Sequence, residues 1–458
     1  MRHTIRLATW LFPAIALLAP LAGQSAGTAA RPNIILCMTD DQGWGDTSYN
    51  GLKKIQTPNL DAMAAAGARF DRFYAAHPSC SPTRASVMTG RHPFRCGVFW
   101  PGMALRKQEM TIAQAVKTAG YTTGHFGKWH LSGGKPGKGR PLPIDDPLHP
   151  GNFGFDHWFS VSNYFETDWT FSRKGELVNV SGDGSDAIVA EALTFIEKSA
   201  KQEKPFLAVV WFGSPHIPLA PKPEDLSAAG GSPFYGEIIG VDRSMGTLRA
   251  GLRKLGIADN TMLWFNSDNG AWMEKKSGPD AFGSNAALRG HKGQLWEGGI
   301  RVPGLLEWPA RIKTPFTTSV PVCTSDIYPT IAEILKLDVP GKTQPLDGIS
   351  ILPLLDGQMK QRPKPIGFWH PGRMGLEDGP VVWNDNQYKL HKLGPEKYEL
   401  YDLIADLAEK NNLAATQPEI VARMKAGMEA WQESVRQSNK GGDYPEKKVI
   451  EPEKAPAN

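Results

Sequence analysis

Acidic and amide side chains follow two apolar runs of the chain at the points where those runs end. Asp40 and Asp41 come directly after one run, and Asp268 and Asn269 follow another. Oxygen ligands of this kind are selected by hard cations such as Ca²⁺ and Mg²⁺, whereas zinc favours His and Cys clusters. An Asp-Asp pair alone is more typical of a turn or a helix cap. Two such clusters at strand ends together favour a metal site.

The segment Cys80-Ser-Pro-Thr-Arg84 is the most specific pattern in the chain. Pro82 suits the first turn of a helix, which would put Cys80 at a helix N-terminus. There the free amides and the helix dipole favour an anion or lower the pKa of a thiol. A lone cysteine in an exported protein is more often buried or disulfide-bonded, and Arg84 one turn into a helix could form a surface ion pair. The Cys-x-Pro-x-Arg spacing favours a chemical role for both residues instead.

Three further segments carry lysine and histidine at similar points. Lys128 and His130 follow a third apolar run, and His216 follows a fourth, between two prolines. Lys292 lies in the basic segment Arg-Gly-His-Lys-Gly. Cations at such points suit the binding of an anion, and imidazoles suit proton transfer. Taken singly, His216 could be a loop histidine and Lys292 part of a solvated turn.

The elements that must position these residues are short apolar runs separated by helical patterns. Continuous runs of this length are typical of strands buried on both faces of a largely parallel sheet. They occupy residues 33–38, 121–126, 206–212 and 261–265. Helices are predicted from Pro58 to Gly67 after a Thr57 cap, from the capping-box pattern Thr111-x-x-Gln114 to Gly120, and over 238–255. This alternation predicts a doubly wound α/β domain, in which ligands bind beyond the carboxyl ends of the strands.

The composition is that of a globular protein with a sizeable core. Of 458 residues, 41% are hydrophobic and 21% are charged, which excludes intrinsic disorder as the main state. The 51 Lys and Arg and the 47 Asp and Glu give a net charge of +4, spread along the chain, so nucleic-acid binding gets no support. Four cysteines cannot form a disulfide scaffold. Cys37 is expected to be a buried strand thiol, and Cys96 and Cys323 either free or paired.

The N-terminus has the pattern of a signal peptide. Basic residues within positions 2–6 precede an apolar stretch over 7–21, and small residues follow over 22–30. The alternative is a membrane anchor, but the stretch contains two prolines and is shorter than the ~20 residues that span a bilayer. We predict a signal peptide over 1–26 and a periplasmic or secreted protein without stable membrane insertion.

The pattern changes after residue 345. Short strand patterns with hairpin-like spacing occupy 365–369, 379–383, 388–392 and 398–403, and an amphipathic helical pattern covers 417–437. We therefore predict a catalytic domain over 31–345, a small α+β subdomain with an antiparallel sheet over 346–440, and a flexible charged tail over 441–458.

The order of these motifs resembles the type I sulfatase family of the alkaline phosphatase superfamily. The resemblance rests on segments whose joint order is more specific than any one of them, namely 32–46, 80–91, 120–130, 267–270, 292–303 and 398–413. It implies an alkaline-phosphatase-like α/β/α sandwich with a large, mostly parallel sheet. The chain looks closest to arylsulfatase A-like and N-acetylgalactosamine-6-sulfatase-like members.

By this resemblance, a maturation enzyme converts Cys80 to Cα-formylglycine. Its hydrate would offer one hydroxyl to attack sulfur and a second to expel sulfate, a step for which serine lacks the oxygen. The resemblance implies one Ca²⁺ per chain, held by Asp40, Asp41, Asp268, Asn269 and the oxidised residue 80. It also implies that Arg84 and Lys128 hold the nucleophile, that His130 takes a proton, and that His216 and Lys292 bind sulfate and protonate the leaving oxygen.

The implied substrate is a sulfate monoester, either a sulfated glycan or an aryl sulfate. The alternatives are a phosphomonoester or phosphodiester hydrolase of the same superfamily, and a non-catalytic carbohydrate-binding relative. The intact Cys80-to-Arg84 motif argues against the first, and the complete set of site residues argues against the second.

Several other residues are candidates for the rim of the site. His125 and His291 are expected to be structural or to lie on the substrate side. Lys135, Lys138 and Arg140 could face an anionic substrate or solvent. Aromatic side chains could stack on sugars, although such residues in long loops more often pack, and the candidates are Trp44, Trp100, Trp158, Tyr164, Phe165, Trp169, Trp369 and His370.

Overall fold

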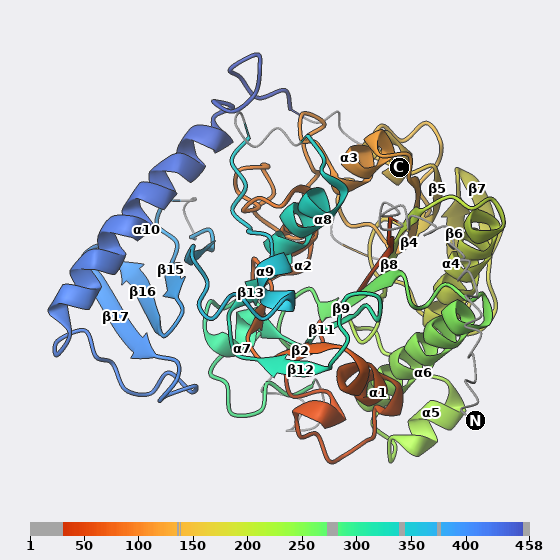
Figure 1. Cartoon of the computed structure of the whole chain (residues 1–458), viewed down its shortest axis with the longest axis horizontal. Helices are drawn as coiled ribbons and strands as arrows, with labels where there is room; N and C mark the ends of the chain where they lie inside the picture. Colours follow the sequence, from red (N-terminus) through yellow and green to blue (C-terminus); the bar gives the residue numbers. More distant parts are fainter. Residues whose placement is uncertain are drawn as a thin grey trace, which may run out of the picture. The chain divides into compact units, whose positions relative to one another are not determined.

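A ten-stranded sheet lies at the centre of the computed structural model (Figure 1). The structure describes residues 31–134, 137, 139–272, 283–338, 344–372 and 377–451. The middle of the sheet is parallel, in the order β9 (Thr261–Ser267), β1 (Asn33–Thr39), β8 (Phe206–Trp211) and β4 (Thr122–Lys128). These strands are the four apolar runs of the sequence, so the predicted parallel centre is confirmed.

Shorter strands extend the sheet on both sides. Beyond β4 come β5 (His157–Val161) in parallel, then β6 (Thr170–Arg173) and β7 (Glu176–Asn179) in antiparallel pairs. Beyond β9 come β11 (Gly304–Glu307) and β2 (Ala68–Phe70), each antiparallel to its inner neighbour, and then β12 (Phe316–Thr318) in parallel with β2. The sheet is therefore mixed at its edges.

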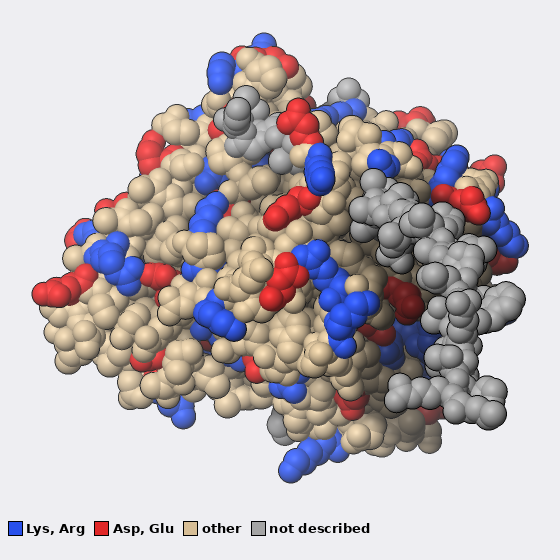
Figure 2. Space-filling model, in the orientation of Figure 1, with Lys and Arg blue, Asp and Glu red and all other residues tan. Residues whose placement is uncertain are grey.

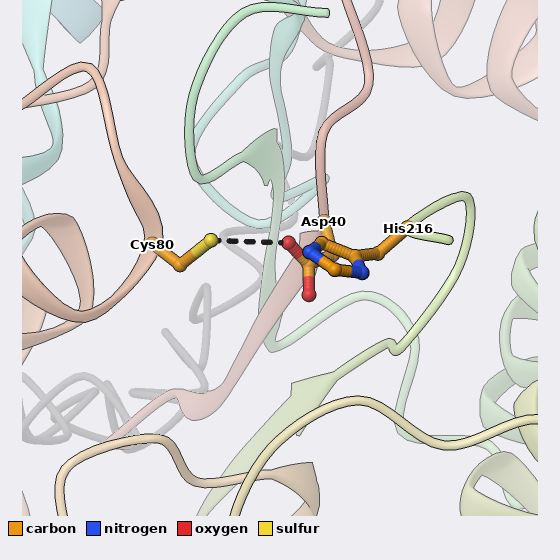
Figure 3. Close-up of side chains that lie close together, drawn as sticks. All are labelled: Asp40, Cys80 and His216. Atoms are coloured by element: carbon orange, nitrogen blue, oxygen red, sulfur yellow. Dashed lines mark hydrogen bonds between the residues drawn. The ribbon is translucent and has the colours of Figure 1, made fainter. Parts of the chain in front are cut away.

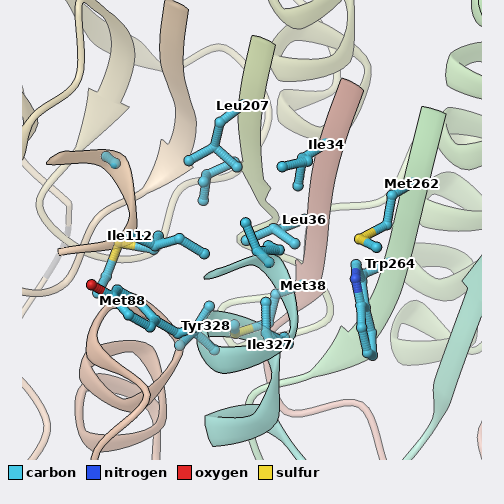
Figure 4. Packing of buried hydrophobic residues seen from close by; sticks show 14 of the residues in the cluster. Ile34, Leu36, Met38, Met88, Ile112, Leu207, Met262, Trp264, Ile327 and Tyr328 are labelled. Carbon is cyan, nitrogen blue, oxygen red and sulfur yellow. The ribbon is translucent and has the colours of Figure 1, made fainter. Parts of the chain in front are cut away.

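Helices cover both faces of the sheet because its central strands are apolar on both sides. Along β1, Ile34, Leu36 and Met38 belong to one core cluster, and Ile35 and Cys37 belong to the other. The first cluster includes side chains of α2 (Cys80–Thr89), α3 (Ile112–Thr118), α8 (Ile327–Leu335) and α9 (Leu352–Leu355) (Figure 4). The second includes side chains of α1 (Pro58–Ala66), α4 (Gly184–Lys201) and α6 (Pro233–Lys254), and α5 (Pro223–Ala228) packs against α6. This arrangement is the predicted α/β/α sandwich.

Local signals in the sequence fix several helix starts. The Thr111 hydroxyl accepts from the Gln114 amide while the Gln114 side chain accepts from Thr111 N, which is the predicted capping box. Pro58 opens α1 as predicted, but the Thr57 side chain does not cap this helix. Its hydroxyl instead forms a 2.7 Å hydrogen bond with the Ser48 hydroxyl.

A four-stranded antiparallel sheet forms in the C-terminal part of the chain. Its order is β14 (Ile366–Trp369), β15 (Val381–Asp385), β16 (Tyr388–Gly394) and β17 (Lys397–Asp402), and α10 (Pro418–Asn439) packs against it (Figure 1). These elements confirm the predicted hairpin-like strands and the helix that follows them. The cluster that includes Ile366 and Val382 joins this sheet to a three-stranded sheet of β10 (Arg301–Val302), β3 (Phe73–Tyr74) and β13 (Val322–Cys323).

The segment predicted as a flexible tail differs from that expectation in its first part. Tyr444 is buried, and its hydroxyl donates to Glu109 Oε1 at 2.6 Å. Asp443 forms an ion pair with Arg91. The prediction of a loose chain is wrong at these two positions, because an aromatic ring and a charge both find buried partners. Residues 452–458 and the predicted signal peptide lie outside the described residues.

Charged side chains of both signs are interspersed over the face of the molecule that Figure 2 shows. This distribution agrees with the small net charge of +4. No helix among the described residues is long and apolar enough to cross a membrane.

The central strand β1 offers a test of the core. Leu36 has 2% of its surface exposed, so Leu36→Ala is expected to lower the free energy of unfolding by about 3 kcal/mol through lost burial and a residual cavity. Leu177→Ala is the matched control, because Leu177 is 70% exposed and its truncation should change stability by no more than about 0.5 kcal/mol. Urea denaturation of both variants measures this, and equal losses would contradict the packing described.

Candidate active site

The carboxyl ends of the parallel strands bring the predicted polar residues to one edge of the sheet. Asp40 and Asp41 follow β1, and Asp268 follows β9. Lys128 is the last residue of β4, and the loop after β8 carries His216. Strand direction alone therefore gathers side chains that are far apart in the sequence.

Cys80, the first residue of α2, joins this cluster. It points toward Asp40 and His216 (Figure 3), and its sulfur donates a hydrogen bond to Asp40 Oδ1 at 3.4 Å. One ligand atom each of Asp40, Asp41, Cys80 and Asp268 lies within 4.8 Å of the others, and all four residues are buried. The structure thus brings most of the predicted metal ligands together.

A close approach of two backbones brings Lys292 to the same edge. Gly270, just after β9, donates from its amide to Gly299 O at 3.0 Å. A Cβ atom at position 270 would lie 1.8 Å from Gly298 O, so only glycine permits this contact. Lys292 Nζ then lies 2.6 Å from Asp41 Oδ1.

Two fully buried cations are paired with the carboxylates. Arg84 Nη2 lies 2.7 Å from Asp268 Oδ2 and 3.7 Å from Asp40 Oδ2. Lys128 Nζ donates to Asp40 Oδ2. Such pairing is needed because an uncompensated buried charge costs several kcal/mol.

Burial and pairing together set the protonation of the cluster. Burial alone would raise the pKa of Asp40, but nearby cations, above all Lys128, hold it well below its usual range. Burial and the neighbouring Asp40 carboxylate raise the pKa of Asp268. Burial and these two carboxylates also raise the pKa of the Cys80 thiol. The expectation of a lowered thiol pKa is therefore wrong, because desolvation outweighs the effect of the helix amides.

Asn269 supplies an observation that tests whether a cation fits. Its Nδ2 donates to Asp41 Oδ1 at 2.7 Å, while its Oδ1 is buried without a hydrogen-bond partner among the described residues. A buried acceptor left in this way costs about 1–3 kcal/mol, which a cation beside it would offset. Since carboxylate and amide oxygens dominate the set, it fits calcium better than zinc.

His130 and Asp41 both have left-handed backbone conformations, with φ of 54° and 68°. Non-glycine residues adopt this region rarely, and functional sites are enriched in it. His130 is held by its backbone, since Ser81 Oγ donates to its carbonyl at 2.6 Å. Burial and the charge of Lys128 keep the pKa of His130 well below its usual range. The ring is therefore neutral at neutral pH.

Glu237 belongs to the site although no pattern in the sequence indicates it. Its carboxylate, which projects from α6, accepts from Ser214 Oγ at 2.5 Å and from Ala220 N at 2.8 Å. These two contacts fasten the loop on both sides of His216. Ser214 O also accepts from Asp40 N at 3.1 Å, which ties the loop to β1. No local pattern marks Glu237, because its partners are 23 and 17 residues away.

Other predicted candidates have different surroundings. His125 is buried, bonds to Ser160 Oγ at 2.7 Å and packs edge-on against Trp129, so it is structural. His291 is half-buried beside Lys292, whose carbonyl lies 2.9 Å from its Nδ1. Arg140 pairs with Asp146 at 2.9 Å. Lys135 and Lys138 lie outside the described residues.

The aromatic residues predicted at the rim of the site differ in their exposure to solvent. Trp158, Phe165 and Trp369 are buried and belong to the packed interior, so they are not rim residues. Trp100 is exposed, whereas the remaining candidates are half-buried, namely Trp44, Tyr164, Trp169 and His370. Within the described chain all four cysteines are buried and free, which includes Cys37, Cys96 and Cys323.

Comparison with known proteins identifies the class of enzyme that this fold and site belong to. The sequence model of the Sulfatase family matches residues 32–337, and the model described as N-sulphoglucosamine sulphohydrolase, C-terminal, matches residues 291–434. The first match covers more than half of the chain. The chain therefore belongs to the sulfatase family and is a sulfuric ester hydrolase.

Individual relatives agree with this assignment. Human N-acetylgalactosamine-6-sulfatase is 32% identical over 373 residues, which cover 74% of this chain and 69% of that protein. Human steryl-sulfatase is 29% identical and covers 88% of each chain. The crystal structure of Ps i-CgsB in complex with k-i-k-neocarrahexaose matches with a TM-score of 0.79, 28% identity and coverage of 90% of this chain and 94% of that one.

The buried carboxyl of Glu237 predicts a pH dependence of stability. Burial and the nearby Asp183 and Glu166 raise its pKa to about 7 from an ordinary value of 4.5. Between these two pH values the folded protein binds a proton that the unfolded chain has lost. The free energy of unfolding therefore falls as pH rises through this window, by about 3 kcal/mol for this group.

Glu237→Gln removes the titration but keeps the shape of the side chain. Its stability relative to wild type is expected to increase between pH 5 and pH 8, because only wild type loses stability in that interval. Urea denaturation at several pH values measures the difference, in which the other titrating groups cancel. A difference that stays constant with pH would show that Glu237 does not titrate in this window.

Proposed function

We propose that this sulfatase removes sulfate from a sulfated glycan, using a formylglycine made from Cys80 and one calcium ion. The observation that carries the proposal is the position of Cys80 at the start of α2, with its sulfur 3.4 Å from Asp40 Oδ1 inside a buried cluster of oxygen ligands. A thiol is poorly suited to this place, because hard cations select oxygen. The hydrate of an aldehyde at residue 80 would offer that oxygen.

Asp40, Asp41, Asp268 and Asn269 would hold the calcium ion together with the oxidised residue 80. When bound, the ion supplies positive charge that lowers the pKa of a hydroxyl on residue 80 and attracts a sulfate oxygen. The unpartnered Asn269 Oδ1 supports this set, since it is a buried acceptor that needs a positive partner.

Four of the five cationic or imidazole side chains of the site divide by exposure into two roles. Arg84 and Lys128 have fully buried side chains, so they orient the carboxylates and neutralise charge around residue 80. Lys292 and His216 are 17% and 16% exposed, so they are the pair that can reach a substrate. We assign them to sulfate binding and to protonation of the leaving oxygen. The neutral His130 accepts a proton when sulfate is released.

A sulfated glycan is the proposed substrate class. One relative is named for the 6-sulfate of N-acetylgalactosamine, and the structure of Ps i-CgsB holds a neocarrahexaose. An aryl sulfate is the simpler alternative, and a phosphate ester is disfavoured by the Cys80-to-Arg84 motif. Sulfate release from a panel of defined O-sulfated saccharides, compared with 4-nitrophenyl sulfate and 4-nitrophenyl phosphate, separates these possibilities.

Export belongs to the same proposal. The N-terminal pattern over 1–26 directs the chain to the periplasm or the exterior, and a maturation enzyme reads the Cys80 motif on the way. Mass spectrometry of the secreted protein tests the export step, because removal of the signal peptide should leave an N-terminus close to residue 27.

Activity is expected to require oxidation of residue 80. Protein made without a formylglycine-forming enzyme should fold, because cysteine and formylglycine are similar in size, yet release almost no sulfate. Protein made with that enzyme should be active and carry the aldehyde. Mass spectrometry of the peptide across 79–84, in parallel with sulfate release from 4-nitrophenyl sulfate, measures both properties.

Two variants control this experiment. Cys80→Ala should keep the thermal midpoint of wild type and lose activity whether or not the maturation enzyme is present. Cys80→Ser, if the maturation enzyme leaves it unchanged, should attack once and remain sulfated, since serine has no second hydroxyl. A fully active enzyme that carries only unmodified Cys80 would refute the formylglycine proposal.

Removal of the metal is expected to abolish activity, and added Ca²⁺ should restore it, because the predicted ligands offer oxygen. Stability gives an independent measure. Ca²⁺ at 100 times its dissociation constant should stabilise wild type by about 3 kcal/mol. Asp268→Asn, which removes one ligand charge, should bind Ca²⁺ more weakly and show a smaller shift of the thermal midpoint at the same concentration. Full activity of a thoroughly metal-stripped protein would overturn the calcium assignment.

A further inference from the structure

An exposed aromatic ring lies beside the catalytic cluster and has no role in the proposed chemistry. Trp100 has 45% of its surface exposed, and it is the one exposed aromatic side chain in the part of the chain that the structure describes. Trp offers a large apolar face and a polar N–H, and residues of this kind are enriched where proteins bind ligands. An apolar ring held in water next to an active site therefore needs an explanation.

The loop that carries Trp100 is anchored on the catalytic helix. The Gly102 amide donates to Ser81 Oγ at 2.8 Å, and the same hydroxyl donates to His130 O at 2.6 Å. A Cβ atom at position 102 would lie 4.0 Å from His130 Nε2. Trp100 is two residues before this contact. Its position is therefore tied to the residue after Cys80 and to the proposed proton acceptor.

A second ring from the C-terminal sheet supports the indole. His370, which follows β14, meets Trp100 edge-on, with ring centroids 5.1 Å apart. His370 also stacks on the buried His77 at 5.4 Å, and His77 Nδ1 forms a 2.8 Å hydrogen bond with Ser79 Oγ. The three rings form a continuous row that starts beside Cys80 and ends at the exposed indole.

The exposed end of this row combines an apolar face with a hydrogen-bond acceptor. His370 Nδ1 lies 2.8 Å from Pro371 O, so this nitrogen carries the proton and Nε2 is left as an acceptor. Burial lowers the pKa of His370, which keeps its ring uncharged at neutral pH. A pyranose ring has C–H groups on its faces and hydroxyl donors at its rim, so it matches both features.

We propose that Trp100 and His370 form a saccharide-binding subsite, in which the indole stacks on a sugar ring and the imidazole accepts a hydroxyl hydrogen bond. The sugar is part of the glycan whose sulfate ester reacts at residue 80, so the inference rests on the proposed function. Trp100 is thereby a specificity-determining residue rather than a catalytic one. It acts on the sugar, while Lys292 and His216 act on the sulfate group.

The test compares a saccharide ligand with a bare anion. Trp100→Ala and Trp100→Phe are measured as mature enzymes with the saccharide that wild type desulfates fastest in a panel of O-sulfated N-acetylgalactosamine, galactose and glucosamine saccharides. Trp100→Ala should raise KM for this substrate about ten-fold, with a smaller change in kcat, and Trp100→Phe should restore most of the loss. The inhibition constant of inorganic sulfate should stay within about two-fold, because the proposed indole contact is with the sugar and not with the sulfate group.

Leu177→Ala is the matched control, since it also removes an exposed apolar side chain, and it should leave KM at the wild-type value. A wild-type KM for Trp100→Ala would overturn the subsite, and so would parallel losses of saccharide and sulfate affinity, which indicate general damage. If wild type releases sulfate from 4-nitrophenyl sulfate but from no saccharide, the glycan assignment fails and this inference fails with it. Normal glycan turnover that does not depend on Trp100 would leave the proposed function intact.

Discussion

Pairing of buried charges at the carboxyl edge of the sheet is the constraint on which the rest of the structure depends. Asp40 and Asp268 are fully buried with Arg84 and Lys128, and Asp41 is paired with Lys292 at its more open side. Any of these charges left alone in the interior would cost several kcal/mol. Each segment that carries one is therefore held to its place by the others.

This constraint explains why the site is assembled from distant parts of the chain. The strands β1, β4 and β9 deliver their ends to one edge, and α2 enters with Cys80 and Arg84 in its first turns. Gly270 then allows the backbone of the Lys292 segment to come close. Glu237 holds the His216 loop in place by accepting hydrogen bonds from Ser214 and Ala220. A rigid cluster of this kind is suited to a reaction in which charge must be matched without rearrangement.

The C-terminal sheet is also connected to the site by charge. Lys389 in β16 lies 2.9 Å from Glu297 Oε1 and 3.0 Å from Glu409 Oε1, and all of these side chains are fully buried. Glu297 begins α7 (Glu297–Ile300), which contains the glycines that contact Gly270. The second sheet thus supports the segment that carries Lys292. It also contributes His370 to the proposed sugar subsite, so one element serves both the sulfate side and the saccharide side.

Local patterns in the sequence predicted the central strands, several helices, the C-terminal elements and the residue types of the site. Apolar runs identified the parallel strands, the Thr111 capping box and Pro58 identified helix starts, and Pro82 placed Cys80 at the start of a helix. These signals are local, because propensity, capping and periodicity act over a few residues. The remaining features depend on contacts between segments that are distant in the sequence. The thiol pKa of Cys80 rises because its surroundings exclude water, Tyr444 packs because Glu109 is within reach, and Glu237 is part of the site through partners on another element. Burial and distance between segments are properties of the folded chain, and no short pattern in the sequence encodes them.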